Sequence, residues 1–230
     1  MLFPLHLFFR CKNTEIMSKK MFISTGKLPS ELSSNPWLMK VLYISNPYIP
    51  FLVFVPIILG LTYYSFAVLQ MTISHFLLFF AIAVAYWTLF EYAMHRFAFH
   101  FETENKAIKR FVYLLHGAHH DYPNDESLFM VSPLTSVSAA IIHYLFLFFL
   151  FGSQIVNPFM IGIMCCYLLY DWLHHAVHSY NFKNKWFQKM KKHHMKHHFH
   201  DSEKGFGFTT VSWDKICLLY TSPSPRDTLL

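Results

Sequence analysis

Residues 41–90 read VLYISNPYIPFLVFVPIILGLTYYSFAVLQMTISHFLLFFAIAVAYWTLF and contain no Asp, Glu, Lys or Arg. Residues 127–170 form a second stretch without any of these four residue types. One helical crossing of a bilayer takes about 20 apolar residues, so each stretch is long enough to cross a membrane twice. We therefore predict an all-α integral membrane protein, with four transmembrane helices in two hairpins at residues 49–69, 73–94, 134–151 and 155–173.

Two alternatives compete with this interpretation. The apolar runs could be buried helices of a soluble bundle, but such helices would need charged outer faces, and these runs have none. The composition favours a membrane protein, because 54% of the residues are hydrophobic and only 14% are charged, against about 25% in soluble domains. The second hairpin has the shorter halves, which could also dip into the bilayer without crossing it.

The distribution of basic residues predicts the orientation in the membrane. All 19 Lys and Arg residues lie before residue 41, within residues 95–110 or after residue 181. By the positive-inside rule these three regions share the cytoplasmic side, and the hairpin connections near residues 70–75 and 152–158 face the opposite side. Basic residues beside membrane spans bind anionic headgroups, so the net charge of +6 needs no nucleic acid to explain it. A bacterial inner membrane and an endoplasmic reticulum both fit this pattern.

The chain divides into three parts by composition. Residues 1–36 are expected to be a polar tail, and residues 37–216 the membrane domain. Residues 217–230 include CLLYTSPSPRD, which matches the translation of a common transposase sequencing adapter, so we interpret them as a sequencing artefact. Between the hairpins, the amphipathic stretch KAIKRFVYLLHGAHH at residues 106–120 predicts a helix on the membrane surface, within a helical cap on the cytosolic side.

The chain has 16 histidines, and ten of them gather beside the predicted spans. They follow the second span, occupy the middle polar segment, end the fourth span and occupy the last polar segment. The predicted topology places all four clusters on the same side of the membrane. Ten neutral imidazole nitrogens are too many for one ion and favour two metal ions with about five ligands each. The ten are His95, His100, His116, His119, His120, His174, His178, His194, His197 and His198.

The spacing within each cluster agrees with helical geometry. Residues three and four apart share a helix face, so HGAHH at 116–120 and HMKHH at 194–198 each place three imidazoles on one face. His174 and His178 are one turn apart where the fourth span leaves the bilayer. His95 and His100 are five apart, which lies off one face, so we expect the helix to end or bend between them.

Acidic residues lie close to the histidine clusters. Metal-bound histidines usually donate their other ring N–H to such groups, which fixes the tautomer and the ring orientation. Two of the acids, Glu91 and Asp171, also need a reason to lie at membrane depth, where a charge is costly. We therefore predict that four carboxylates support the ligands: Glu91, Asp121, Asp171 and Asp201.

The other six histidines are not expected to bind metal. Five of them lie in the tail, in a connection on the far side, or close to a predicted ligand. His143 falls near mid-bilayer, where a hydrogen-bonded histidine or one that lines a substrate path would fit. The six are His6, His75, His143, His175, His193 and His200.

The order of these motifs resembles the fatty acid 2-hydroxylases of the sterol desaturase and fatty acid hydroxylase superfamily. The resemblance covers about residues 36–216. In the third motif, His175 replaces the usual tyrosine and Ser179 the usual last histidine, so the choice of His174 rests on its four-residue spacing from His178. The motifs are EYAMHRFAFH (91–100), HGAHHDYP (116–123), YDWLHHAVH (170–178), KKHHMKHHF (191–199) and KGFGFTTVSWD (204–214).

The resemblance implies a function for the site. It implies a diiron centre held by the ten histidines named above, with O2 as co-substrate, and hydroxylation at carbon 2 of the acyl chain of a ceramide-type lipid or its precursor. Zinc, which lacks redox activity, could occupy the site in a purified form. No HPGG haem motif is present, so no fused cytochrome b5 domain is expected, and a separate donor such as cytochrome b5 or ferredoxin with its reductase would supply electrons. Two alternatives are a sterol or carotenoid hydroxylase or desaturase with the same motifs, and a divalent metal transporter.

Overall fold

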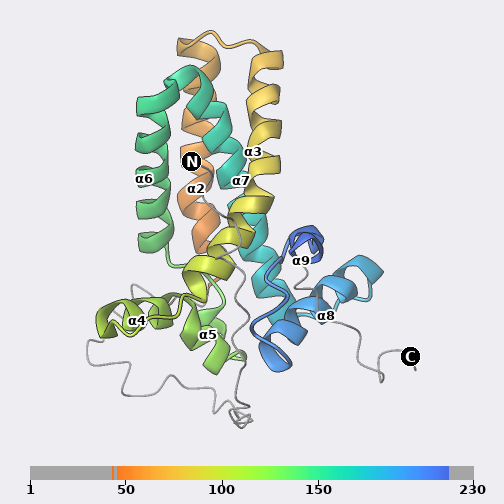
Figure 1. Cartoon of the computed structure of the whole chain (residues 1–230). Coiled ribbons are helices and arrows are strands. Elements are labelled where there is room, and N and C mark those ends of the chain that lie inside the picture. The colour runs from red at the N-terminus through yellow and green to blue at the C-terminus, as the bar shows by residue number, and fades with distance from the viewer. Residues whose placement is uncertain (1–42, 44–45, 218–230) are drawn as a thin grey trace.

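The structure is a computed structural model that describes residue 43 and residues 46–217. The predicted polar tail at residues 1–36 lies outside the described residues, as does all of the predicted artefact except Cys217. Every regular element within the described part is a helix, and it contains no strand. Four long helices stand side by side, and shorter helices gather at one end of them (Figure 1).

The four long helices confirm the two predicted hairpins. Each is long enough and apolar enough to cross a membrane. Two of them continue beyond the regular α-helix as π-helical turns, in which backbone hydrogen bonds span five residues instead of four. The four are α2 (Ile49–Tyr63) with the π-helical Tyr64–Val68, α3 (Ile73–Ala93) with the π-helical Met94–Phe99, α6 (Pro133–Phe151) and α7 (Ser153–Ser179).

The second hairpin differs from the prediction at its turn and at its end. A single residue, Gly152, separates α6 from α7, and its φ of 70° is a backbone conformation that favours glycine. Pro158, which we expected in the connection, lies inside α7. At its other end α7 continues to Ser179, six residues beyond the predicted end at Leu173. These extensions make α7 a helix of 27 residues, which is longer than a bilayer crossing needs.

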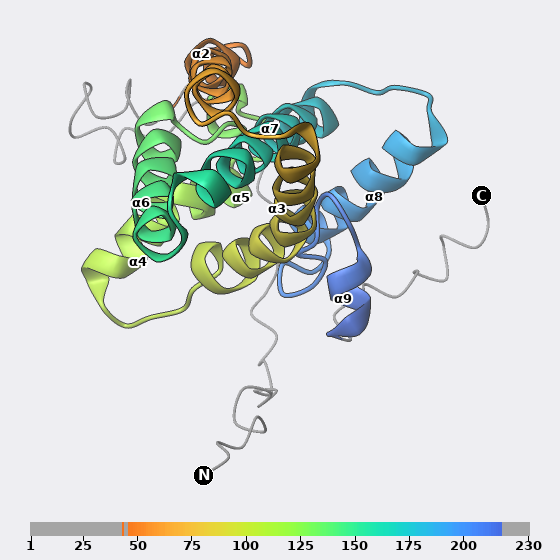
Figure 2. The same cartoon turned by 90° about the horizontal axis from the view of Figure 1, so that it is seen from above.

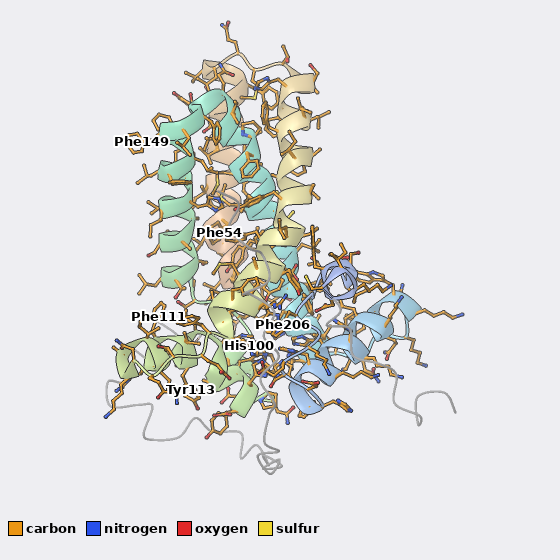
Figure 3. The ribbon with its side chains drawn as sticks, in the orientation of Figure 1. Phe54, His100, Phe111, Tyr113, Phe149 and Phe206 are labelled. Carbon is orange, nitrogen blue, oxygen red and sulfur yellow. The ribbon has the colours of Figure 1, made fainter. Side chains whose placement is uncertain are left out.

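Helix α7 is the centre of the bundle and packs against α2, α3 and α6. Half of its most apolar stretch is buried, against 11% for α2, 11% for α3 and 6% for α6. The three outer helices therefore expose apolar side chains on their outer faces, as Phe149 of α6 shows at 82% exposure (Figure 3). Water does not solvate such surfaces favourably, so the bundle is built to be surrounded by lipid.

The short helices form a cap at one end of the bundle (Figures 1 and 2). Asn105 and Asn184 begin two of them, because each side-chain amide oxygen accepts hydrogen bonds from two backbone N–H groups of the first turn. The predicted surface helix at residues 106–120 is present, with a π-helical turn in its middle. The cap consists of α4 (Lys106–Val112), the π-helical Tyr113–Gly117, α5 (Ala118–Asp121), a 3-10 turn at Glu126–Leu128, α8 (Lys185–Phe199) and α9 (Ser212–Ile216).

Candidate metal centre

The ten predicted histidines meet where the bundle joins the cap. They form two groups of five, and within each group one ring nitrogen per residue lies within 4.8 Å of all the others. His100, which ends the π-helical turn after α3, marks this junction in Figure 3. The first group is His95, His100, His116, His120 and His197, and the second group is His119, His174, His178, His194 and His198.

Each H-x-x-H-H motif contributes to both groups. In HGAHH, His116 and His120 belong to the first group, whereas His119 belongs to the second. Relative to the first histidine, the residue four positions on is rotated by about 40° and the residue three positions on by about 60° in the opposite sense. The three imidazoles therefore cover a wide stripe rather than a single line. One helix can serve two adjacent sites in this way.

The spacing of the ring nitrogens fits a metal ion. His95 Nε2 lies 3.1 Å from His116 Nε2, and His116 Nε2 lies 3.0 Å from His120 Nε2. In the second group, His194 Nε2 lies 2.9 Å from His178 Nε2 and 3.0 Å from His198 Nε2. Two nitrogens at about 2.1 Å from one ion and at right angles to each other would be about 3.0 Å apart, against about 3.4 Å in a tetrahedron. At these separations neighbouring nitrogens of a group can bind one ion together.

Backbone carbonyls fix the tautomers of three of these histidines. The Nδ1 atoms of His95, His174 and His197 lie 2.7, 2.7 and 2.8 Å from the carbonyl oxygens of Phe206, Phe129 and Lys204. A carbonyl only accepts hydrogen bonds, so each Nδ1 carries the proton and each Nε2 presents a lone pair to its group.

Several nitrogens in the two groups are buried without a hydrogen-bond partner. They include both ring nitrogens of His119 and the Nε2 atoms of His100 and His174. Burying an unpaired polar atom is costly, and lone pairs that converge repel one another. A cation at the centre of each group would remove both penalties. The residues present therefore fit two metal ions.

Burial also keeps these imidazoles neutral. It lowers the pKa of His100 to about 3 and that of His197 to about 4, although the carbonyl of Lys204 opposes the shift at His197. Burial and the neighbouring histidines hold the pKa values of the other cap ligands well below their usual range as well. A neutral imidazole is the form that binds a metal. These other ligands are His116, His119, His120, His194 and His198.

The groups that accept hydrogen bonds from the histidine rings are not the carboxylates that we predicted. Asp121 accepts a hydrogen bond from the Tyr113 hydroxyl, and Asp201 pairs with Lys204 at 3.0 Å. The acceptors at His95, His174 and His197 are backbone carbonyls instead. Backbone carbonyls can accept these hydrogen bonds because the segments that contain Phe129, Lys204 and Phe206 lie directly against the rings. Backbone acceptors have no residue signature, which is why the motifs did not reveal them.

The two buried carboxylates at membrane depth bind backbone instead of imidazole. Glu91 accepts from the N–H groups of Phe208 and Thr209 at 2.7 and 2.9 Å and from the Thr209 hydroxyl. Asp171 accepts from the Val131 N–H at 3.1 Å and from the Tyr167 hydroxyl at 3.3 Å. Both acids therefore fasten a loop to a membrane helix.

The remaining histidines that the structure describes lie outside both groups. His175 is buried beside Phe129 and does not share the ring cluster of its neighbour His174. His75 lies at the other end of the bundle, with Nε2 3.0 Å from the Gln154 carbonyl oxygen. His193 and His200 also stay outside both groups, and His6 lies outside the described residues.

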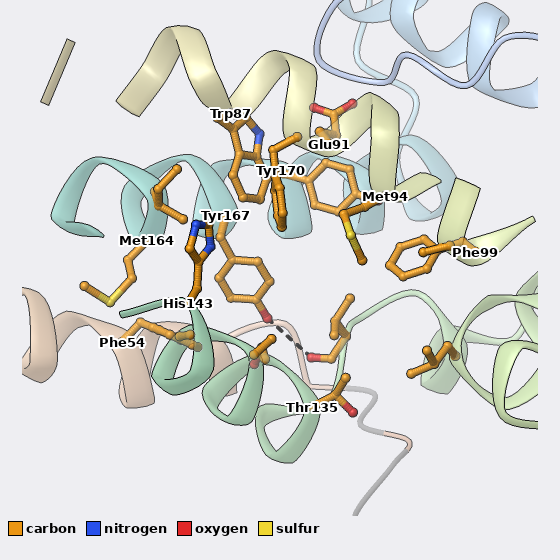
Figure 4. A pocket seen from close by; sticks show the side chains of 18 of the residues that line it. Phe54, Trp87, Glu91, Met94, Phe99, Thr135, His143, Met164, Tyr167 and Tyr170 are labelled. Carbon is orange, nitrogen blue, oxygen red and sulfur yellow. Dashed lines mark hydrogen bonds between the residues drawn. The ribbon is translucent and has the colours of Figure 1, made fainter. Parts of the chain in front are cut away.

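An apolar cavity of about 360 Å³ lies inside the bundle next to the histidine groups, although none of the ten histidines lines it. Phe99 and Tyr170 line it at the cap end, where their rings stack on His116 and His174. Figure 4 shows Met94 and Phe99 at one end of the cavity and Phe54 at the other. His143 also lines the cavity, beside Tyr167, as the sequence suggested for a histidine at this depth. The volume is within the usual range of sites for small ligands.

The fold and the site define a class: a bundle of four membrane-spanning helices, with two five-histidine groups able to hold metal ions at its capped end. The family model described as fatty acid hydroxylase matches residues 79–218, and the chain belongs to that family. Similar proteins include a dihydroceramide fatty acyl 2-hydroxylase of Arabidopsis thaliana, 37% identical over 59% of this chain and 57% of the relative. The fatty acid 2-hydroxylase of Rattus norvegicus is 31% identical over 77% of this chain and 49% of its own.

A solved structure shows the same arrangement of helices. It is described as full-length scs7p with only the hydroxylase domain visible, and it matches with a TM-score of 0.73 and 26% identity. The match covers 80% of this chain and 69% of that chain. The chain spans about half the length of the curated relatives named above.

Proposed function

We propose that this chain is an O2-dependent hydroxylase that acts at carbon 2 of a fatty acyl chain, in a ceramide-type lipid or its fatty acid precursor. The observation that carries the proposal is the convergence of ten histidines next to an apolar cavity. Family membership and the activities named for the relatives from Arabidopsis thaliana and Rattus norvegicus support the choice of reaction. The membrane domain that would carry out this reaction occupies residues 37–216.

The reaction needs chemistry that side chains do not supply. Two iron ions, when bound, would supply the redox chemistry that lets O2 oxidise an unactivated C–H bond. The ten histidines would hold these ions, and the carbonyls of Phe129, Lys204 and Phe206 would keep three of the rings oriented. The two electrons for each turnover would come from a separate carrier, such as cytochrome b5 or ferredoxin with its reductase.

The cavity favours a carbon close to the polar end of the substrate. Its apolar walls would hold the acyl tail along the bundle, between the rings of Phe99 near the histidines and Phe54 deeper in the bundle. The headgroup would then remain at the capped end, where charged residues and the membrane surface lie. Carbon 2 is next to the headgroup and would lie beside the histidine groups. The positive-inside pattern supports a cytoplasmic location for this end, in an endoplasmic reticulum or a bacterial inner membrane.

Lipid mass spectrometry of a host that expresses the chain tests this function. Membranes with the wild-type chain should gain 2-hydroxy acyl lipids, one oxygen heavier than their precursors. His120→Ala should lose this product, because His120 belongs to the first group. His200→Ala is the matched control, because His200 is an exposed histidine that follows α8 and lies outside both groups.

Other products would assign the site to a different reaction. Unchanged acyl chains together with oxidised sterols or carotenoids would favour the other branch of the superfamily. Metal uptake into vesicles that depends on His116 would favour transport. Transport sites usually lie near mid-membrane, whereas these histidines lie at the capped end of the bundle (Figure 3).

A further inference from the structure

The segment that follows α8 contacts the last turns of α3 and also lies against the histidine groups. Residues 204–210 run between α8 and α9 and lie against the ligands of both groups. Lys204 and Phe206 provide the carbonyls that hold His197 and His95, which both belong to the first group. The Phe206 ring packs edge-on against His95, His100 and His197, with ring centroids 5.2 to 5.6 Å apart. We call residues 204–210 the strap.

Two buried carboxylates hold the strap in place. Asp214 is fully buried, and its two oxygens accept hydrogen bonds from the N–H groups of Phe206 and Gly207 at 2.9 and 2.8 Å. Glu91 of α3 binds the next two residues of the strap through the N–H groups described above. Four consecutive backbone N–H groups are thus bound by carboxylates. Charged acceptors make such hydrogen bonds stronger than neutral ones.

The shape of the strap also depends on its glycines. Gly205 has φ of 73°, in the left-handed region. At Gly207, a Cβ atom would lie 2.2 Å from the carbonyl oxygen of Thr210 and 2.8 Å from Asp214 Oδ2. The turn around Asp214 is therefore closed only because residue 207 has no side chain. This tight turn fixes the direction of the Phe206 carbonyl.

The second group is supported by different parts of the chain. The carbonyl of Phe129, in the loop before α6, holds His174. The strap touches this group through the Phe208 ring, which packs against His174 and His194 at 5.6 and 5.1 Å between centroids. The strap therefore accepts hydrogen bonds from the ring N–H groups of two histidines of the first group, His95 and His197. It contacts the second group only through the Phe208 ring.

We propose that Asp214 is a positioning residue for one of the two metal sites. Through the strap it orients His95 and His197, so that the first histidine group keeps its metal, whereas the second group meets the strap only through the Phe208 ring. This inference rests on the proposed metal centre, since it assigns separate supports to its two halves. Losing such an outer partner typically lowers metal affinity by about 10- to 100-fold.

Metal content of the purified full chain in detergent tests the proposal. Wild type loaded with iron or zinc should hold two ions per chain. His197→Ala should keep only the ion of the second group, and His178→Ala should keep only the ion of the first group. Asp214→Asn should lower the affinity of one ion by about 10- to 100-fold. In the His178→Ala background it should leave the chain almost without metal, whereas in the His197→Ala background it should change nothing. A loss of fold would affect both backgrounds alike.

Two further variants complete the experiment. Asp121→Asn is the matched control, because that carboxylate binds the Tyr113 hydroxyl and not the strap, and it should keep two ions. Gly207→Ala displaces the turn around Asp214, since its Cβ would lie 2.2 Å from the Thr210 carbonyl oxygen, and it should repeat the background-dependent loss if Asp214→Asn does not accumulate. Equal loss from both backgrounds, or two ions held with unchanged affinity, would overturn the role of the strap. A wild type that binds no metal would instead overturn the proposed function.

Discussion

His95 and His100 point into the same metal group although five residues separate them. The backbone N–H of His100 donates to the carbonyl of His95 at 3.2 Å, which closes a π-helical turn at Met94–Phe99. In an α-helix, residues five apart diverge by about 140°. The wider π-helical turn brings them back to one face, and the two ring centroids lie 5.1 Å apart. The π-helical turn ends at Phe99, so the helix ends between the two histidines, which agrees with the expectation from their spacing.

This relationship predicts that shortening the turn is tolerated better than lengthening it. Deleting Phe97, which is 55% exposed, would reduce the separation of the two histidines from five positions to four, as in an ordinary α-helical turn, whose ends also share one face. Inserting an alanine after Phe97 would make the separation six and turn His100 away. We expect the deletion to keep about two ions per chain and the insertion about one, measured by elemental analysis. Similar metal loss in both variants would contradict this view of the π-helical turn.

The sequence was sufficient to predict the membrane bundle and the set of histidines. Charge-free runs of this length favour membrane spans over the buried helices of a soluble bundle, so four helices could be placed, although the end of α7 was missed by six residues. The ten histidines could be chosen because they cluster beside these runs, whereas His75 and His143 do not. Helix ends were less certain, because a π-helical turn and the continuation of α7 to Ser179 depend on contacts in the cap.

The division of the histidines into two groups could not be predicted. Neighbours in one motif, such as His119 and His120, serve different groups, and only the relative placement of four segments decides this. The supports were missed for another reason. Carboxylates are visible in a sequence and backbone carbonyls are not, so Asp121 and Asp201 were chosen while the carbonyls of Phe129 and Phe206 were overlooked. Asp214 could have been noticed in KGFGFTTVSWD, where it is the only acid.

The buried imidazoles predict that the metal-free protein loses stability in mild acid. Burial lowers the pKa of His197 to about 4 and that of His100 to about 3, whereas both titrate near 6.5 in the unfolded chain. Between these values and pH 6.5 the unfolded chain binds more protons, so the free energy of unfolding falls as the pH falls. Each group contributes up to roughly 1.4 kcal/mol per pH unit in its own window.

Thermal unfolding of chelator-treated protein at pH 7.5, 6 and 5 measures this effect. The midpoint should change little above pH 6.5 and fall below it. His197→Gln should make the decline shallower, because one proton-binding group of the unfolded chain is removed. His200→Gln should leave the decline as it is in wild type, since His200 is exposed in the folded chain too. A midpoint that stays constant from pH 7.5 to 5 would show that these histidines are not buried as neutral groups.

Filling the cavity is expected to change activity without removing the metal. Ala140 of α6 lines the cavity, so Ala140→Phe places a ring in the space proposed for the acyl tail. Hydroxylation of long acyl chains should fall by at least about tenfold, which corresponds to a barrier increase of about 1.4 kcal/mol. Phe149→Leu on the outer face of α6 is the control, because Phe149 points away from the bundle (Figure 3).

The readout for this variant has two parts, lipid product and bound metal. If the cavity holds the acyl tail, Ala140→Phe keeps two ions per chain and loses product from long chains before short ones. If Ala140→Phe hydroxylates acyl chains of every length as fast as wild type does, the acyl tail does not lie in this cavity. Loss of both metal and product would mean that the extra ring disturbs the packing of α6 on α7.

The glycines of the chain offer a last contrast, between Gly207 in the strap and Gly60 in α2. A Cβ atom at Gly207 would meet the Thr210 carbonyl oxygen at 2.2 Å, whereas nothing lies within 4 Å of a Cβ atom at Gly60. Gly207→Ala must therefore displace the turn around Asp214, at a cost of about 1–3 kcal/mol for overpacking. Gly60→Ala lies inside a helix and should stabilise the chain by roughly 0.5–1 kcal/mol. Thermal unfolding midpoints should move in opposite directions, and only Gly207→Ala should lose the ion of the first group. Equal metal content in the two variants would show that the turn at Asp214 does not control the direction of the Phe206 carbonyl.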